Sequence, residues 1–206
     1  MVGKRLVSEL LSSPTFNQVI VLVRKPINET LLSSLPNPSK LTQRLVDFAH
    51  LNVKDFKGAQ VGFSCLGTTR ADAGSDARFV EIDHDYTLNS AKLMRENNVD
   101  QFHLLTAGGS NANSWLLYPR TKGLLEKHVA ELGFPRLVIY RPGLLLHSGD
   151  QRDSNRTLEK MAIWVATTFG IRAGTIEMGM LAKTIRIQAE SNEPGTTILE
   201  NAQMWE

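Results

Sequence analysis

Apolar residues recur along this chain with two alternating periods, one typical of helices and the other typical of buried strands. Over residues 3–11 they stand three and four positions apart, which predicts an amphipathic helix that ends before Pro14. Val19–Val23 is instead an unbroken run of mostly β-branched residues. Such a run indicates a strand buried on both faces, as in parallel sheets that are covered by helices.

The same two patterns continue through most of the chain. Their alternation predicts an α/β fold with a doubly wound parallel sheet, because parallel neighbours need a crossover helix between them. We therefore expect one Rossmann-like domain over residues 1–206, in which residues 150–195 form a small helical region on the substrate side. Further strands are expected at 45–48, 61–67, 101–106, 136–140 and 196–199, and further helices at 86–97, 119–132, 156–169 and 179–189.

Composition and charge exclude several classes of protein. The 206 residues are 42% hydrophobic and 21% charged, which is ordinary globular usage. The net charge of +2 gives no argument for binding nucleic acid or a membrane surface, and no apolar stretch reaches the roughly 18 residues of a membrane span. With one cysteine, Cys65, and five histidines at no metal-ligand spacing, we expect a reducing compartment and no metal site.

A tyrosine and a lysine four residues apart give the most specific chemical signal. Tyr118 and Lys122 stand at the start of a predicted helix, where this spacing puts both side chains on one face. A neighbouring ammonium favours the ionised form of a phenol and brings its pKa toward the range useful for proton transfer. A surface tyrosine beside a solvated lysine is the alternative, so the surrounding motifs decide.

Two loops follow strands at the edge where open α/β sheets bind ligands. We expect the Thr106 hydroxyl to polarise a carbonyl oxygen while Tyr118 moves the proton, with Ser110 as the competing hydroxyl. A loop threonine bonded to its own backbone is the alternative. The next loop adds three candidates for cofactor contact, Arg141, Pro142 and Gly143, although a proline–glycine pair also marks a simple turn.

Residues after other strands predict a nucleotide site. Arg24 and Lys25 follow Val19–Val23, at the position where an arginine can meet the 2′-phosphate of NADP and an acid would hold the ribose of NAD. We therefore expect NADP, with NADPH preferred over NADH; two solvated cations are the alternative. Small residues after the strand 61–67 would let a cofactor lie close to the backbone. The candidates there are Cys65, Leu66, Gly67 and Thr68, and Asp47 is a further candidate after the strand 45–48.

Several motifs, taken together, resemble one known family. They are CLGTTR at 65–70, FVEIDHDY at 79–86, HLLTAGG at 103–109, YPRTKGLLE at 118–126 and YRPG at 140–143. In combination they are similar to the Tat-interactive-protein oxidoreductases, which are atypical short-chain dehydrogenase/reductases.

The resemblance implies NADPH binding, with Tyr118 as acid or base and Lys122 as ribose anchor. It places the catalytic hydroxyl in a serine pair that stands here as Thr106 and Ala107. It also implies a mainly cytoplasmic location with nuclear traffic, roles in apoptosis and growth control, and partners such as nuclear import factors. Such proteins open with a strand and a GxxGxxG turn, of which this chain starts at the last glycine, Gly3, so we expect a strand to be missing between 19–23 and 61–66.

Three functional hypotheses follow. The first is an NADP-dependent oxidoreductase that acts on a carbonyl or alcohol. The second is a non-catalytic or redox-sensing regulatory protein that uses the nucleotide fold as a scaffold. The third is an isomerase or epimerase, because extended relatives share the tyrosine and lysine. The substrate is not identified, since the residues after Gly143 carry no diagnostic motif.

Overall fold

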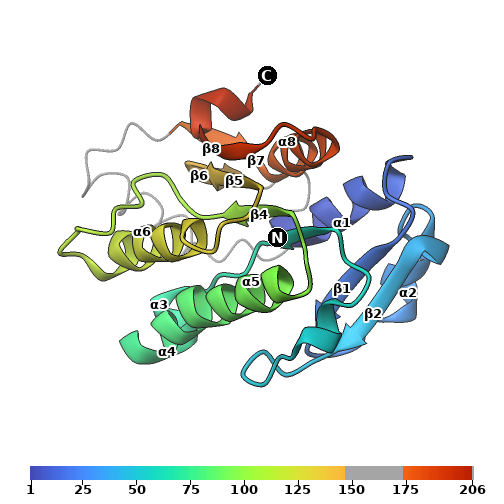
Figure 1. The fold of residues 1–206 in the computed structure, drawn as a ribbon, viewed down its shortest axis with the longest axis horizontal. Helices are drawn as coiled ribbons and strands as arrows, with labels where there is room; N and C mark the ends of the chain where they lie inside the picture. The colour runs from blue at the N-terminus through green and yellow to red at the C-terminus, as the bar shows by residue number, and fades with distance from the viewer. Residues whose placement is uncertain (147–173, 206) are drawn as a thin grey trace.

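A four-stranded parallel sheet forms the centre of the molecule (Figure 1). The computed structural model describes residues 1–146 and 174–205. In spatial order the strands are β3 (Val61–Ser64), β4 (Gln101–Leu105), β5 (Arg136–Arg141) and β8 (Gly195–Glu200), and every neighbouring pair is parallel. The inner strands β4 and β5 are almost entirely buried, and most of their residues are apolar.

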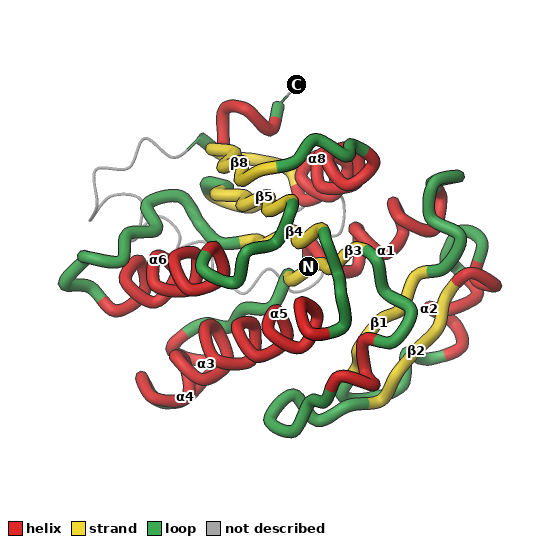
Figure 2. Tube along the Cα trace, in the orientation of Figure 1, coloured by secondary structure: helices red, strands yellow, loops and turns green. Residues whose placement is uncertain are grey.

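Helices cover both faces of this sheet and give three layers (Figures 1 and 2). Helices α1 (Val2–Ser12) and α8 (Met178–Glu190) pack together on one face, and α5 (Tyr86–Glu96) and α6 (Leu117–Ala130) lie on the other. Alternate residues of β5 enter the two cores: Val138 contacts the first layer and Ile139 the second. The predicted doubly wound α/β fold is confirmed.

A second, smaller sheet lies beside the first. It consists of β1 (Val19–Val23) and β2 (Leu41–Leu45), which pair in parallel. In the described part of the chain no hydrogen-bonded ladder joins β1 to β3. The division falls between the two strands where the motif resemblance predicts a missing neighbour.

Short elements connect these layers. Between β3 and α5 the chain forms α3 (Arg70–Ala73), α4 (Asp76–Val80) and a π-helical turn over Glu81–Asp85 that runs directly into α5. Strands β6 (Leu144–Leu146) and β7 (Thr175–Glu177) pair in parallel with each other. The remaining elements are α2 (Glu29–Ser33) and the 3₁₀ turns Pro38–Lys40, Val53–Phe56 and Asn201–Met204.

Most predicted elements are confirmed to within a few residues, but the strand at 45–48 is wrong. The strand is β2, which ends at Leu45 and is half-exposed, so no continuous apolar run marks it. Beyond it, the Asp47 carboxylate accepts the Ala49 N–H and forms a turn. The strand at 61–67 is shorter than predicted, because the ladder with β4 ends at Ser64.

Part of the prediction lies outside the described residues. This applies to the helix at 156–169 and to most of the helical region at 150–195. None of the helices in residues 1–146 and 174–205 has both the length and the apolar character to cross a membrane.

Candidate functional site

The loops after β3, β4 and β5 meet at the carboxyl edge of the central sheet. The hydrogen-bond register aligns the ends of the three strands. The loop after β4 packs on the loop after β5: the Gly108 N–H donates to the Pro142 carbonyl over 2.7 Å. A Cβ on Gly108 would lie 3.3 Å from that oxygen, so the close approach favours glycine. Open parallel sheets bind their ligands at this edge.

Helix α6 begins at this edge and carries Tyr118 and Lys122. As predicted, the two residues lie one turn apart on the same face of a helix. Gly123 lets the helix approach the loop after β4, because a Cβ there would overlap the backbone of Asn111 and Ala112. This close packing leaves Lys122 only 4% exposed.

The Lys122 ammonium forms a buried ion pair with Asp83. Lys122 Nζ and Asp83 Oδ1 are 2.6 Å apart, and both side chains are almost fully buried. Asp83 lies on the π-helical turn, and its Oδ2 accepts the backbone N–H of Thr68 over 2.7 Å. One carboxylate therefore joins the loop after β3, the π-helical turn and α6. Single π-helical turns within helices are frequent at functional sites.

The surroundings of Tyr118 favour the protonated phenol. Although the residue is partly exposed, burial of its hydroxyl end is the main cause of a raised pKa. The Lys122 ammonium lowers this pKa, as the sequence analysis expects, but burial outweighs it and the Asp83 carboxylate raises the pKa further. The Phe79 ring packs against Tyr118 with 5.9 Å between ring centres. The phenol therefore holds a proton that it can transfer, although the raised pKa makes it a weaker acid.

A second ion pair, between Glu126 and Arg141, lies further along the same face of α6. Arg141 Nε and Nη2 donate to both Glu126 carboxylate oxygens, with Nη2 and Oε2 2.6 Å apart, and Nη1 donates to Glu200. Hydrogen bonding to Glu126 raises the pKa of Arg141. The Thr106 hydroxyl donates to Glu126 Oε1 over 2.6 Å. Thr106 and Arg141, predicted to contact substrate and cofactor, are therefore both bonded to one carboxylate.

The two candidate hydroxyls differ in their surroundings. Thr106 is buried, and its Glu126 partner stands two helical turns from Tyr118, about 12 Å along the axis at the usual helical rise. Ser110 is partly exposed, and its hydroxyl donates to the Ala107 carbonyl over 2.7 Å. The role of Thr106 as the group that polarises a carbonyl stays a prediction.

Among the predicted cofactor residues after β3, Gly67 lies beside Lys122 and Cys65 lies beside the start of α1. A Cβ on Gly67 would lie 3.7 Å from Lys122 Nζ, and one on Gly3, in the first turn of α1, would lie 3.6 Å from Cys65 Cβ. Burial raises the pKa of the Cys65 thiol to about 12, which makes it a weak nucleophile. The predicted residues of this loop are Cys65, Leu66, Gly67 and Thr68.

Other predicted cofactor residues lie on different loops. Arg24 and Lys25 are exposed just after β1, and Asp47 is exposed just after β2. A hydrogen bond to His50 lowers the pKa of Asp47. In the loop after β5, the Gly143 N–H donates to the Asn201 side chain over 2.8 Å.

The residues beside Lys122 fit a nicotinamide nucleotide. Gly67 has no side chain, and even a Cβ would lie 3.5 Å from Asp83 Oδ1, so a larger residue would fill the space next to the ion pair. Asp83 Oδ1 lies close to the ammonium but has no hydrogen bond of acceptable angle from any described residue. Lysine has three N–H donors, so Lys122 retains donors for a hydroxyl-rich group such as a ribose.

Asp83 and Glu126 are not among the site residues that the sequence predicts. Glu126 continues the four-residue spacing of Tyr118 and Lys122 on α6, and this spacing could have identified it. Asp83 stands four residues after Phe79, which is fully buried, so its position indicates an acid on an inward face. Their partners, Lys122 and Arg141, lie on other elements and cannot be identified from local spacing.

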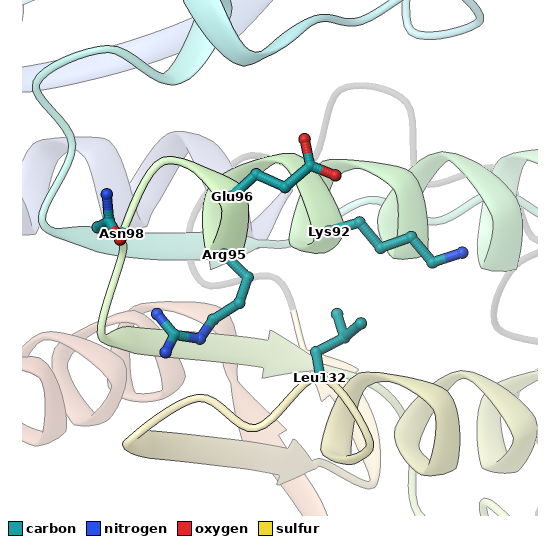
Figure 3. Close-up of a pocket in the computed structure, with 5 residues that line it drawn as sticks. All are labelled: Lys92, Arg95, Glu96, Asn98 and Leu132. Carbon is teal, nitrogen blue, oxygen red and sulfur yellow. The ribbon is translucent and has the colours of Figure 1, made fainter.

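A shallow recess lies away from this edge, next to the end of α5 and the segment that follows α6 (Figure 3). Its volume is about 370 Å³, and none of its residues belongs to the predicted site. It lies near the start of β4, at the amino end of the strands. The residues that line the recess are Lys92, Arg95, Glu96, Asn98 and Leu132.

In residues 1–146 and 174–205 no group of three or more His, Cys, Asp or Glu side chains is arranged to hold a metal.

Comparisons with known proteins find relatives at the level of sequence. No family model matches the chain. Protein HTATIP2 of Rattus norvegicus is 40% identical over 146 residues, which cover 70% of this chain and 58% of that protein. Protein FMP52-1, mitochondrial, of Scheffersomyces stipitis is 33% identical over 80% of this chain and 71% of its own length. Protein fmp52, mitochondrial, of Emericella nidulans is 32% identical, with coverage of 82% and 72%.

Solved structures share the fold at low sequence identity. A putative NAD-dependent epimerase/dehydratase from Bacillus halodurans matches with a TM-score of 0.68 and 16% identity, over 96% of this chain and 87% of that one. MoeE5 in complex with UDP-glucuronic acid and NAD matches with a TM-score of 0.70 and 15% identity, over 96% and 72%. These matches support the Rossmann-like fold described above.

The comparisons also correct one expectation and settle the family. Several FMP52 relatives are named as mitochondrial proteins, so the expected cytoplasmic and nuclear location is wrong. That expectation followed from the motif resemblance, and the lone cysteine indicates only reducing conditions. With 33% identity across 71% of FMP52-1, and with the motifs noted above, the chain belongs to the family of HTATIP2 and the FMP52 proteins.

Proposed function

We propose that this protein is a nicotinamide-dependent oxidoreductase of the short-chain type, which transfers hydride between the nucleotide and a carbonyl or alcohol. One observation carries the proposal: Tyr118 and Lys122 lie one turn apart at the carboxyl edge, with the lysine buried against Asp83. A surface tyrosine beside a solvated lysine would show no such burial. The NAD-dependent names of the structural neighbours agree with the proposal but support the fold alone.

The chemistry assigns a different task to each side chain. The nicotinamide, when bound, supplies the hydride. Tyr118 donates its phenolic proton to the carbonyl oxygen, so the carbonyl becomes an alcohol and Tyr118 becomes a phenolate. The Lys122 ammonium stabilises that phenolate and holds the ribose, and the phenolate then takes a proton from water. Thr106 is the predicted group that polarises the carbonyl, and Ser110 is its competitor.

The preferred nucleotide is NADPH. Arg24 and Lys25 are exposed directly after β1, where a 2′-phosphate can reach their charges without displacing an existing ion pair of the described residues. NAD has no phosphate at this position, so it gains nothing from either cation.

Titration with NADPH and with NADH tests both statements. We expect the parent chain to prefer NADPH, and Arg24→Ala to weaken NADPH binding by about tenfold or more while NADH affinity stays unchanged, because a charge-assisted hydrogen bond is lost. Lys54→Ala, which removes an exposed cation from a different turn, is the matched control. Equal affinities for the two nucleotides would show that Arg24 does not contact the nucleotide. If the chain binds neither nucleotide, the proposed function is wrong.

A mitochondrial location is proposed from the names of the FMP52 relatives. Imaging of a carboxyl-terminal fluorescent fusion beside a mitochondrial marker tests it. The regulatory hypothesis, with import factors as partners and a role in apoptosis, stays a prediction from the motifs. Tight NADPH binding with no turnover across a broad panel of aldehydes and ketones would favour that hypothesis over the enzyme.

A further inference from the structure

We propose that Asp83 is a positioning residue of this site, which holds the Lys122 ammonium and the loop after β3 in the arrangement that receives the nucleotide. This inference rests on the proposed function and assigns a role to a residue that is not part of the tyrosine–lysine motif.

The position of Asp83 supports this role. Its two carboxylate oxygens face different segments: Oδ1 lies 2.6 Å from Lys122 Nζ on α6, and Oδ2 accepts the Thr68 N–H after β3 over 2.7 Å. Within the described residues, Asp83 is the one charged group in contact with the Lys122 ammonium. Movement of this carboxylate would therefore displace both the lysine and the glycine-containing loop beside it.

Of the acidic side chains on the π-helical turn, only that of Asp83 is buried. The turn contains three acidic residues, Glu81, Asp83 and Asp85. The side chains of Glu81 and Asp85 are 40% and 59% exposed and pair with Arg78 and His84, whereas that of Asp83 is 1% exposed. Asp85 thus provides a matched surface aspartate on the same turn.

Stability alone does not account for the Asp83–Lys122 pair. The desolvation of two opposite charges costs about as much as their attraction returns, and well-packed apolar side chains of similar volume are often at least as stable. Within the described residues, the Lys122 ammonium has one charged partner and Asp83 Oδ1 accepts from no group besides it, so the pair does not use its full bonding capacity. A buried pair with unused donors and acceptors is suited to receive a polar ligand.

Asp83 also acts on Tyr118 through its charge. The groups that face Tyr118 are Lys122 from its own helix, Asp83 from the π-helical turn and the apolar Phe79 ring from α4. The Asp83 carboxylate raises the pKa of Tyr118, whereas Lys122 lowers it. Removal of the carboxylate is therefore expected to move ionisation of Tyr118 to lower pH.

The main test is a double-mutant cycle read by NADPH titration and thermal unfolding. The variants are Asp83→Asn, Lys122→Met and the double variant, with Asp85→Asn as the control. Asn keeps the size of Asp83 and an acceptor for Thr68 but removes the charge. We expect Asp83→Asn to weaken NADPH binding by about tenfold, and this effect to fall below about twofold in the Lys122→Met background. Asp85→Asn is expected to bind as the parent does.

Two results would overturn the proposal. One is a lower melting temperature in Asp83→Asn with unchanged NADPH affinity, which is the result of a purely structural role. The other is an equal loss of affinity in both lysine backgrounds, which would mean that Asp83 does not act through Lys122. If Asp83→Asn fails to fold, the double variant, in which no buried charge is left unpaired, still allows comparison with Lys122→Met.

A second measurement does not depend on the nucleotide and so separates this inference from the proposed function. Acetic anhydride modifies free amines, and peptide mass spectrometry reports modification at Lys122 relative to the exposed Lys25. If the carboxylate holds the amine, Asp83→Asn is expected to raise the relative modification of Lys122 several-fold, and Asp85→Asn is expected to leave it unchanged. An unchanged ratio in Asp83→Asn would contradict the positioning role even if the parent chain binds no nucleotide.

Discussion

Two buried ion pairs lie one helical turn apart on the same face of α6, and they are bonded very differently. Glu126 receives three N–H contacts within 3.2 Å from Arg141 Nε and Nη2 and a fourth hydrogen bond from Thr106. Asp83 lies 2.6 Å from the Lys122 ammonium through Oδ1 and accepts one hydrogen bond, from the Thr68 N–H, at Oδ2. The first pair uses its bonding capacity within the protein, while the second leaves capacity for a ligand.

The cation explains much of this difference. Arginine has a planar group of five donors that matches both oxygens of a carboxylate, whereas lysine is a compact charge with three rotating donors. The pair with arginine can therefore fix two loops against α6, and the pair with lysine can exchange partners. We infer that proton transfer and nucleotide binding belong to the Lys122 end of the helix, and that Glu126 itself holds the loops after β4 and β5 in place.

The largest effect is expected at the Lys122 end. Tyr118→Phe removes the transferable proton and little packing surface, so turnover is expected to fall by about 10² to 10⁴-fold while NADPH affinity changes by less than about twofold. The assay is NADPH oxidation with a panel of aldehydes and ketones. Tyr86→Phe, which removes a hydroxyl bonded to Glu81, is the control and keeps full turnover. Normal turnover in Tyr118→Phe would falsify the assignment of chemistry to this end.

The opposite pattern is expected at the Glu126 end. Glu126→Gln leaves Arg141 with Glu200 as its remaining carboxylate and weakens the bond to Thr106. We expect the free energy of unfolding to fall by about 3 kcal/mol, the low end for one partner of a buried pair, because Arg141 is 24% exposed and partly screened. Urea unfolding measures this loss.

The control for that variant is Glu131→Gln at the exposed end of α6, where a change below about 0.5 kcal/mol is expected. Folded Glu126→Gln is expected to bind NADPH with the affinity of the parent. A loss of affinity comparable to that of the Lys122 variants would abolish the distinction between the two ends.

The smallest effect on stability is expected from loss of the Thr106 hydroxyl, which joins the loop after β4 to Glu126. Thr106→Val keeps the shape of the side chain but removes the hydroxyl that donates to Glu126, so we expect a loss of about 2 kcal/mol in the free energy of unfolding. Ser110→Ala, in the partly exposed part of the same loop, is expected to cost less than about 1 kcal/mol. Turnover of the two folded variants then identifies the catalytic hydroxyl. A tenfold greater loss in Thr106→Val supports the sequence prediction, and the reverse assigns the role to Ser110.

Local patterns predicted the strands that contain a run of apolar residues. Val19–Val23 is a continuous apolar run, although of its residues only Val19 is buried, and β5 is apolar over 137–140. The face shared by Tyr118 and Lys122 follows from helical geometry. Strand β2 was misplaced because it is half-exposed and its residues form no such run. The sequence pattern therefore predicts strands with a continuous apolar run better than strands of mixed polarity, even when the two lie side by side, as β1 and β2 do.

The electrostatics of the site depend on contacts between distant segments. Asp83 and Lys122 come from different elements, and no spacing rule predicts their 2.6 Å approach. Likewise, a nearby lysine predicts a lowered pKa for Tyr118, but burial by surrounding segments reverses the sign. The chemical groups were visible in the sequence, while their protonation states required the fold.

Substitution of Gly123 during evolution would disturb the position of Tyr118 and Lys122. Alanine is the most favourable residue for a helix, so replacement of a helical glycine by alanine usually stabilises a protein. Here the added methyl group would overlap the backbone of Asn111 and Ala112, which cannot turn aside as a side chain can. A lineage that acquired this substitution would have to move α6 and the adjoining loop apart, and Tyr118 and Lys122 would move with the helix. Position 123 therefore restricts which neighbouring sequences keep Tyr118 and Lys122 in place, although no ligand needs to contact it.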